Sequence, residues 1–256
     1  MPLRSNIKKG TVSLIIIVIL WLAVAGIVFG LTLSQRVNAS ARLLPVYSVD
    51  TGNEKKAAIT FDAAWGDETT DDVLNVLAQN GVRASFFFVG EFAEKYPESV
   101  RKICNAGHDV CNHSMRHLDP VKQEYTGICA DMENCNELLY SLTGKVPVFY
   151  RAPSGSYDNK TIEAANSLGM TAVQWDNDSI DWKEVGVNDI VKRVMKKLSP
   201  GSILLFHLGR ENTLAALPEI LALMKEQGYE IVPLSELIIS GESFIDSNGR
   251  QHPSGG

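Results

Sequence analysis

Two histidines spaced four residues apart are the first feature of the sequence with the chemistry of a metal site. His113 and His117 form an H-x-x-x-H pattern. On a helical turn this spacing places both imidazoles on one side, where they can bind one divalent ion. The pattern has no glutamate directly after the first histidine, so it is not the motif of the zincin metalloproteases. We therefore predict a divalent metal at this pair, with Zn²⁺ as the expected ion.

Other ionisable residues follow short apolar segments that are typical of buried strands. Five segments end in this way: 57–61 before Asp62, 108–112 before His113, 148–150 before Arg151, 170–175 before Asp181, and 202–206 before His207. One polar residue after a strand is usually part of a turn. Five of them, with these side-chain types, indicate a shared site, because the carboxyl ends of barrel strands converge on one mouth.

The strands alternate with amphipathic segments that have helical periodicity. Helices are predicted over 68–80, 98–106, 123–142, 159–168, 188–198 and 213–227, and further strands over 84–89 and 230–232. Apolar strands separated by helices favour a parallel sheet covered by helices. The predicted fold class is therefore α/β, a distorted (β/α) barrel with seven to eight strands. No G-x-G-x-x-G follows the first strand, so no nucleotide cofactor is expected.

The N-terminus carries an apolar segment that is long enough to span a membrane. Residues 11–34 contain no charged side chain, and about 20 such residues cross the hydrocarbon core as a helix. The cations Arg4, Lys8 and Lys9 favour a cytoplasmic N-terminus. A signal peptide cleaved near Ala41 is the alternative, although this apolar run is longer than a usual signal sequence.

These patterns predict a single-pass protein of the cell membrane with an extracytoplasmic catalytic domain. The predicted parts are a cytoplasmic N-terminus (1–10), a transmembrane anchor (11–34), a linker (35–54), the catalytic domain (55–240) and a flexible tail (241–256). The chain of 256 residues has a net charge of −6, which is unfavourable for binding nucleic acid. Its four cysteines form no C-x-x-C pair, and their pairing stays open.

Five motifs together resemble those of the polysaccharide deacetylases, the NodB-homology family or carbohydrate esterase family 4. They occur in order across residues 55–240: Thr60-Phe61-Asp62, His113-Ser114-x-x-His117, Arg151-Ala152-Pro153-Ser154-Gly155, Asp178-Ser179-Ile180-Asp181-Trp182 and Leu204-Leu205-Phe206-His207. Each motif alone is weak, but five in order are highly specific. The stretch from Thr60 to Asp67 is most similar to the PdaB-type sporulation branch.

The resemblance implies a metal-dependent hydrolase that removes N-acetyl groups from amino sugars of peptidoglycan or a related cell-wall glycan. It also implies a role for each matching residue: Asp62 as general base, His207 as general acid, Asp181 as the carboxylate that orients His207, Arg151 as the arginine that orients the carboxylates, His113 and His117 as metal ligands, the backbone N–H of Ser154 as oxyanion donor, and Trp182 and Leu205 as the acetyl slot. Tyr157 is a further candidate for the substrate groove. Asp178 is expected to be a turn or cap residue, and Trp175 to lie in the core.

One position departs from the family pattern and leaves two functions open. Ala63 stands where the family has a second aspartate, the third metal ligand. Asp67 is a candidate substitute, although it also fits the N-cap of a helix beginning at Glu68. The first function is a metal-dependent deacetylase, acting on N-acetyl or O-acetyl groups. The alternative is a metal-deficient glycan-binding or sporulation protein on the same barrel.

Overall fold

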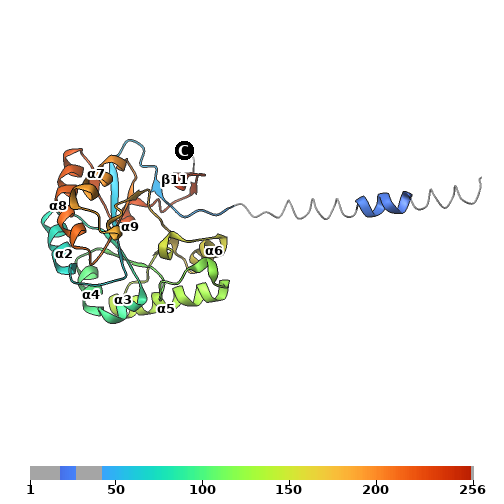
Figure 1. Ribbon diagram of the computed structural model, residues 1–256, viewed down its shortest axis with the longest axis horizontal. Coiled ribbons are helices and arrows are strands. Elements are labelled where there is room, and N and C mark those ends of the chain that lie inside the picture. Colours follow the sequence, from blue (N-terminus) through green and yellow to red (C-terminus); the bar gives the residue numbers. More distant parts are fainter. Residues whose placement is uncertain (1–17, 27–41, 255–256) are drawn as a thin grey trace, which may run out of the picture. The chain divides into compact units, whose positions relative to one another are not determined.

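The computed structural model describes residues 18–26 and 42–254 of the chain (Figure 1). Residues 18–26 are helical, and residues from Leu43 onward form a separate compact unit. Most of the predicted anchor at 11–34 lies outside the described residues. Among those described, no helix is both long enough and apolar enough to cross a membrane.

A curled, wholly parallel sheet forms the centre of the larger unit. Its strand order is β6-β5-β4-β3-β2-β8-β7, and β9 pairs separately with β2. The strands are β2 (Lys56–Ala63), β3 (Ser85–Phe88), β4 (Asp109–Asn112), β5 (Phe149–Tyr150), β6 (Thr171–Ala172), β7 (Asn177–Asp178), β8 (Ile203–His207) and β9 (Glu230–Ile231). This topology fits the predicted distorted barrel, with seven strands along the main path.

Helices surround the curled sheet (Figure 1). They are α2 (Thr70–Gln79), α3 (Gly90–Lys95), α4 (Pro97–Asn105), α5 (Tyr125–Thr143), α6 (Asn159–Ser167), α7 (Val187–Lys197), α8 (Glu211–Glu226) and α9 (Leu234–Leu237), with 3-10 turns at Pro120–Lys122, Pro153–Gly155 and Asp181–Lys183. Six of these helices match the predicted segments within a few residues, whereas α3 and the short α9 are additions.

The central strand β2 separates an apolar exterior from a polar interior. Successive side chains of a strand point to opposite faces. Phe61 and Ala63 belong to the main apolar cluster that the helices cover. Thr60 and Asp62, on the other face, bond to Arg151. The interior of the barrel is therefore polar at its carboxyl end, where a site can form.

The expected strand over 170–175 is interrupted, and only its first part pairs with β5. Val46 pairs with the end of β6 and the residues after it: its N–H donates to Ala172 O (2.9 Å), and its carbonyl accepts from Gln174 N (2.7 Å). The segment containing Val46 continues to the other side of the sheet, where Val49 N donates to Gly201 O (3.0 Å). Residues 46–49 thus bond to β6 at one edge of the sheet and to the segment that leads into β8.

Part of the tail expected to be flexible over 241–256 forms strands, which differs from that expectation over residues 243–253. The strands β10 (Ser243–Ile245) and β11 (Arg250–Pro253) form a three-stranded sheet with β1 (Ser48–Val49). His252 lies between two carboxylates, with Asp50 Oδ2 at 3.0 Å and Asp246 Oδ2 at 3.3 Å. The strand β1 and Asp50, which pair with this hairpin, lie about two hundred residues earlier in the chain. Local composition therefore did not reveal the hairpin.

Candidate active site

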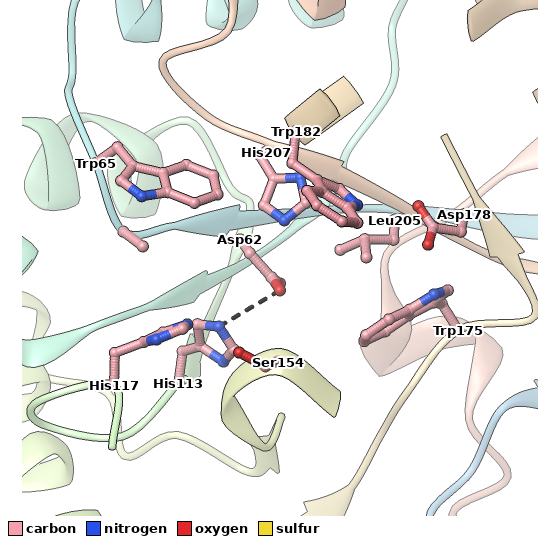
Figure 2. A pocket seen from close by; sticks show the side chains of 11 residues that line it. Asp62, Trp65, His113, His117, Ser154, Trp175, Asp178, Trp182, Leu205 and His207 are labelled. Carbon is pink, nitrogen blue, oxygen red and sulfur yellow. Dashed lines mark ion pairs between the residues drawn. The ribbon is translucent and has the colours of Figure 1, made fainter. Parts of the chain in front are cut away.

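Most of the site residues singled out in the sequence line one cavity at the carboxyl edge of the sheet or bond to residues that line it (Figure 2). Its volume is about 430 Å³, and it is lined by Asp62, Ala64, Trp65, His113, His117, Ser154, Trp175, Asp178, Trp182, Leu205 and His207. These residues come from β2, β7 and β8 and from the loops that follow β2, β4, β5, β6 and β7. The prediction that distant strand ends meet at one mouth is confirmed by this arrangement.

Arg151 is fully buried beneath the cavity and holds Asp62 in place. Its Nη1 donates to Asp62 Oδ1 (2.7 Å) and to Thr60 Oγ1 (2.9 Å). Its Nη2 donates to Gln174 O (3.0 Å), and the guanidinium lies over the Phe87 ring, 4.0 Å from its centroid. The bonds fix one oxygen of the carboxylate and leave the other, Oδ2, toward the histidines.

The charge state of Asp62 follows from two opposing effects. Burial disfavours the carboxylate and would raise the pKa of Asp62, but the Arg151 guanidinium and the nearby imidazoles outweigh it. The pKa of Asp62 therefore lies below its usual range. Asp62 is ionised at neutral pH and can accept a proton.

His113 presents an unprotonated nitrogen to this carboxylate. Its Nδ1 lies 2.8 Å from the carbonyl oxygen of Arg151, and because a carbonyl only accepts, Nδ1 carries the hydrogen. Burial lowers the pKa of His113 to about 4, so the ring is neutral and Nε2 has a free lone pair. That lone pair is 3.4 Å from Asp62 Oδ2. Two electron-rich atoms at this distance fit a cation or a proton between them.

The loop that carries the two histidines is not helical, which corrects the prediction of a helical turn. Ser114 and His117 have φ values of 69° and 53°, in the left-handed region. Side chains from outside the motif hold this backbone: Asn112 Oδ1 accepts from Ser114 N (2.7 Å), and Asp131 Oδ2 of α5 accepts from Met115 N (2.8 Å). The imidazoles of His113 and His117 still lie close, with 5.0 Å between ring centroids.

On the other side of the cavity, His207 is held by a buried carboxylate. Asp181 Oδ1 accepts from the His207 Nδ1 (2.6 Å), and its Oδ2 accepts from the backbone N–H of His207 (2.8 Å) and from Thr213 Oγ1 (2.5 Å). Burial would raise the pKa of Asp181, but the hydrogen bonds and the charge of His207 lower it below its usual range. With Nδ1 engaged, His207 has only Nε2 available for a substrate.

The third metal ligand of the family has no equivalent here. The methyl group of Ala63 packs in the apolar cluster outside the sheet, and Ala64 is the residue that lines the cavity. Asp67 is not among the lining residues, because its carboxylate accepts from Ser99 Oγ (2.7 Å) in α4. It is not a cap either, since α2 begins at Thr70 without a side-chain cap.

The remaining donor set fits a cation at the two histidines and no fuller site. Within residues 18–26 and 42–254, no three His, Cys, Asp or Glu side chains are arranged to hold a metal ion together. Catalytic zinc sites usually have three protein ligands. The two neutral imidazoles are chemically competent ligands, and the second nitrogen of His113 is bonded to a carbonyl as metal-binding histidines usually are.

Most of the predicted substrate residues lie at the cavity, and several lining residues were not predicted. Ser154, Trp182 and Leu205 line it, whereas Tyr157 does not and receives a hydrogen bond from Tyr47 (3.1 Å between hydroxyl oxygens). The lining residues missed from the sequence are Ala64, Trp65, Trp175 and Asp178. Asp178 also accepts from Ile180 N (2.8 Å), as a turn residue would. For Ala64, Trp65 and Asp178 the available signal was their place within the motif stretches, whereas Trp175 ends the predicted strand over 170–175.

A buried carboxylate and a His–Asp pair at one cavity of a curled parallel sheet define the class of this protein, and comparisons with known proteins agree. The sequence profile of the polysaccharide deacetylases matches residues 50–173. A peptidoglycan-N-acetylglucosamine deacetylase of Bacillus cereus is 35% identical over 196 residues, covering 73% of this chain and 89% of that protein. A chitooligosaccharide deacetylase of Bradyrhizobium is 30% identical over 76% of this chain and 98% of its own length.

Solved structures of the same family superpose well on the chain. A carbohydrate esterase family 4 pseudoenzyme from Bacillus anthracis gives a TM-score of 0.74 at 28% identity, over 82% of this chain and 73% of its own. A variant of that pseudoenzyme with restored enzymatic activity gives 0.73 at 30% identity, over 75% and 70% of the two chains. This chain belongs to the polysaccharide deacetylase family.

We expect the Arg151→Met variant to be strongly destabilised. The substitution leaves the Asp62 carboxylate buried without its partner, which costs about 3–5 kcal/mol. Urea unfolding at pH 7 measures the loss. Arg83→Met is the matched control, because the Arg83–Glu236 pair is exposed and such pairs contribute about 0–1 kcal/mol. Equal losses in the two variants would contradict the central role of Arg151.

We expect the stability contribution of Asp181 to depend on pH in a defined direction. Its folded-state pKa is lowered, so the stabilisation is present above the unfolded pKa of about 4 and is lost as pH falls through the folded pKa. The difference in unfolding free energy between wild type and Asp181→Asn, about 2 kcal/mol at pH 7, should therefore narrow toward pH 3. Denaturant titrations at several pH values measure it.

Asp176→Asn provides a control of opposite sign. Burial raises the pKa of Asp176, so ionisation of this carboxylate opposes folding as pH rises through the unfolded value. Relative to the Asp176→Asn variant, the free energy of unfolding of the wild type should increase as the pH is lowered. The same trend for Asp176 and Asp181 would contradict the opposite directions of their pKa shifts.

Proposed function

We propose that this chain hydrolyses the amide bond of N-acetylated amino sugars in peptidoglycan or a related cell-wall polysaccharide. The observation that carries the proposal is that one cavity joins an ionised carboxylate, two neutral imidazoles and a His–Asp pair. Amide hydrolysis needs activation of water, stabilisation of the developing oxyanion and protonation of the leaving amine. The groups at this cavity are suited to these tasks.

The proton transfers can be assigned to individual atoms. Asp62 Oδ2 is not engaged by Arg151 and accepts a proton from the water that attacks the acetyl carbonyl. His207 Nε2 donates a proton to the amine nitrogen as the C–N bond breaks, which releases acetate and the free amino sugar. Asp181 stabilises the imidazolium form of His207 that this step requires. The backbone N–H of Ser154 is the candidate oxyanion donor, and Trp182 and Leu205 are the candidate acetyl slot.

Metal dependence belongs to the proposal as well. His113 Nε2 and the His117 imidazole would hold a divalent ion, with Zn²⁺ as the expected one, and water or substrate would complete its coordination. When bound, such an ion supplies Lewis-acid stabilisation of a developing oxyanion. The lowered pKa values of both histidines, caused mainly by burial, keep them neutral, as metal binding requires.

The cellular setting is proposed from the sequence. The apolar run over 11–34 supports a membrane anchor with the catalytic domain outside the cytoplasm. The motif from Thr60 to Asp67 supports a role in sporulation or cell-wall modification. The relatives of this chain include deacetylases of peptidoglycan and of chitooligosaccharides. A β-linked N-acetylglucosamine chain is therefore the first substrate to test.

A metal-deficient glycan-binding protein is the second candidate, and two observations favour it. Ala63 lies in the apolar cluster, so no ligand occupies the usual third position. A structural neighbour of the family is itself a pseudoenzyme. Zinc content of the purified chain and acetate release distinguish the two candidates.

We expect the Asp62→Asn variant to lose about 10²- to 10⁴-fold in acetate release from N-acetylglucosamine oligomers, because the amide cannot accept the proton of the attacking water. Acetate is measured enzymatically in zinc-supplemented buffer. Asp178→Asn is the matched control, since that carboxylate lines the same cavity but serves as a turn residue. Equal turnover by wild type and Asp62→Asn would remove Asp62 as the base.

We expect the Ala64→Asp variant, and not Ala63→Asp, to strengthen zinc binding. Residue 64 lines the cavity, whereas residue 63 faces the apolar cluster, where an unpaired carboxylate costs several kcal/mol. Calorimetric titration with zinc should give about a tenfold lower Kd for Ala64→Asp, and thermal unfolding should show a lower Tm for Ala63→Asp. Stronger zinc binding by Ala63→Asp would contradict the orientation of β2.

A further inference from the structure

Trp65 is a large apolar side chain at the cavity that takes no part in the proposed proton transfers. It lies in the loop after β2, lines the cavity and is 48% exposed. Tryptophan is enriched where a surface binds a partner, because its ring offers a large apolar area and its N–H a polar contact. Trp65 lies beside the proposed general acid, with 5.0 Å between its ring centroid and that of His207.

The indole is fixed before any ligand arrives. The Arg210 guanidinium lies over the Trp65 ring, 4.3 Å from the centroid, as in a cation–π contact. The two loops that carry these residues are joined: Gly209 N donates to Thr69 Oγ1 (3.0 Å). At Gly209, with φ of 81°, a Cβ would lie 2.7 Å from the carbonyl oxygen of Gly66, so only glycine allows this approach.

Arg210 is held in this position at an energetic cost. Its Nε is buried and has no hydrogen-bond partner in the part of the chain that the structure describes. A buried unpaired N–H is unfavourable. In this position the Arg210 guanidinium contacts the Trp65 ring, which lines the cavity. We interpret the contact as one that orients the indole.

In Figure 2, Trp65 lies across Asp62 from Trp175, while the Trp182 ring is drawn over His207. The acetyl slot of the proposed function is on the Trp182 side. For a glycan chain bound with one acetyl group in that slot, Trp65 is a half-exposed aromatic ring at the wall of the same cavity. The apolar C–H face of a pyranose ring is complementary to an indole face.

We propose that Trp65 is a substrate-binding residue that stacks on the pyranose ring next to the acetylated one, and that Arg210 is a positioning residue acting through it. The inference rests on the proposed function and adds a specificity: the site binds oligosaccharides in preference to a single amino sugar. A preset platform binds more tightly, because little side-chain freedom is lost on association.

Binding, and not turnover, tests this inference. The Asp62→Asn chain is titrated by calorimetry with tetra-N-acetylchitotetraose and with N-acetylglucosamine. Adding Trp65→Ala should weaken tetramer binding about tenfold and leave monomer binding unchanged, whereas Trp65→Phe should cost at most about threefold. Arg210→Met should weaken tetramer binding about threefold, and Arg210→Lys, which keeps the cation, should restore most of it.

Phe244→Ala is the matched control, because Phe244 is also an exposed aromatic ring next to a histidine but lies in the C-terminal hairpin. Its tetramer affinity should equal that of the parent. Unchanged tetramer affinity in both Trp65 variants, no tetramer binding by the parent, or an equal loss for monomer and tetramer overturns the inference. Tight tetramer binding without acetate release by the chain with native Asp62 instead contradicts the proposed function and leaves the inference standing.

Discussion

The buried guanidinium of Arg151 is the interaction on which the geometry of the site depends. Its side chain binds the carboxylate of Asp62 and carbonyl groups beyond β6. Its backbone N–H donates to Asn112 O (2.9 Å), and its carbonyl accepts from His113. One residue therefore orients the proposed base and sets the tautomer of a candidate metal ligand. Because a buried ion pair contributes little net stability against an apolar replacement, its presence is better explained by the chemistry that it arranges.

Backbone strain is concentrated in the loops that carry site residues. The described residues other than glycine with positive φ are Ser114, His117, Ser154, Ile180 and Glu184, and all five lie in three loops that carry site residues. Such conformations cost about 1–3 kcal/mol each and persist where surrounding contacts over-determine them. Here those contacts include side chains of neighbouring elements, such as Asp131 of α5. The strain is consistent with loops shaped for a ligand and not only for folding.

The sequence predicted the strand ends and the residues that meet there, because both depend on local periodicity and on one rule of barrel topology. The parts it did not predict depend on distant partners. The H-x-x-x-H segment leaves helical geometry because Asn112 and Asp131 bind its backbone, and the C-terminal hairpin is ordered by β1. The spacing of Asp67 suggested a ligand or a cap, yet Ser99 of α4 binds it instead. Such competition between partners is not visible in a single sequence.

The orientation of β2 bears on whether the site is active. The side chain of Ala63 does not face the cavity: its methyl group packs in the apolar cluster. Ala64 is the residue after the base whose side chain lines the cavity. The strand thus continues regularly past the base, so the two imidazoles are the metal donors that remain at this site within the described residues. Yet the hydrogen-bonded His207–Asp181 pair is intact. A binding protein has no need for a buried carboxylate that stabilises an imidazolium. The retained acid and base therefore support the proposed hydrolysis over the proposed glycan-binding role.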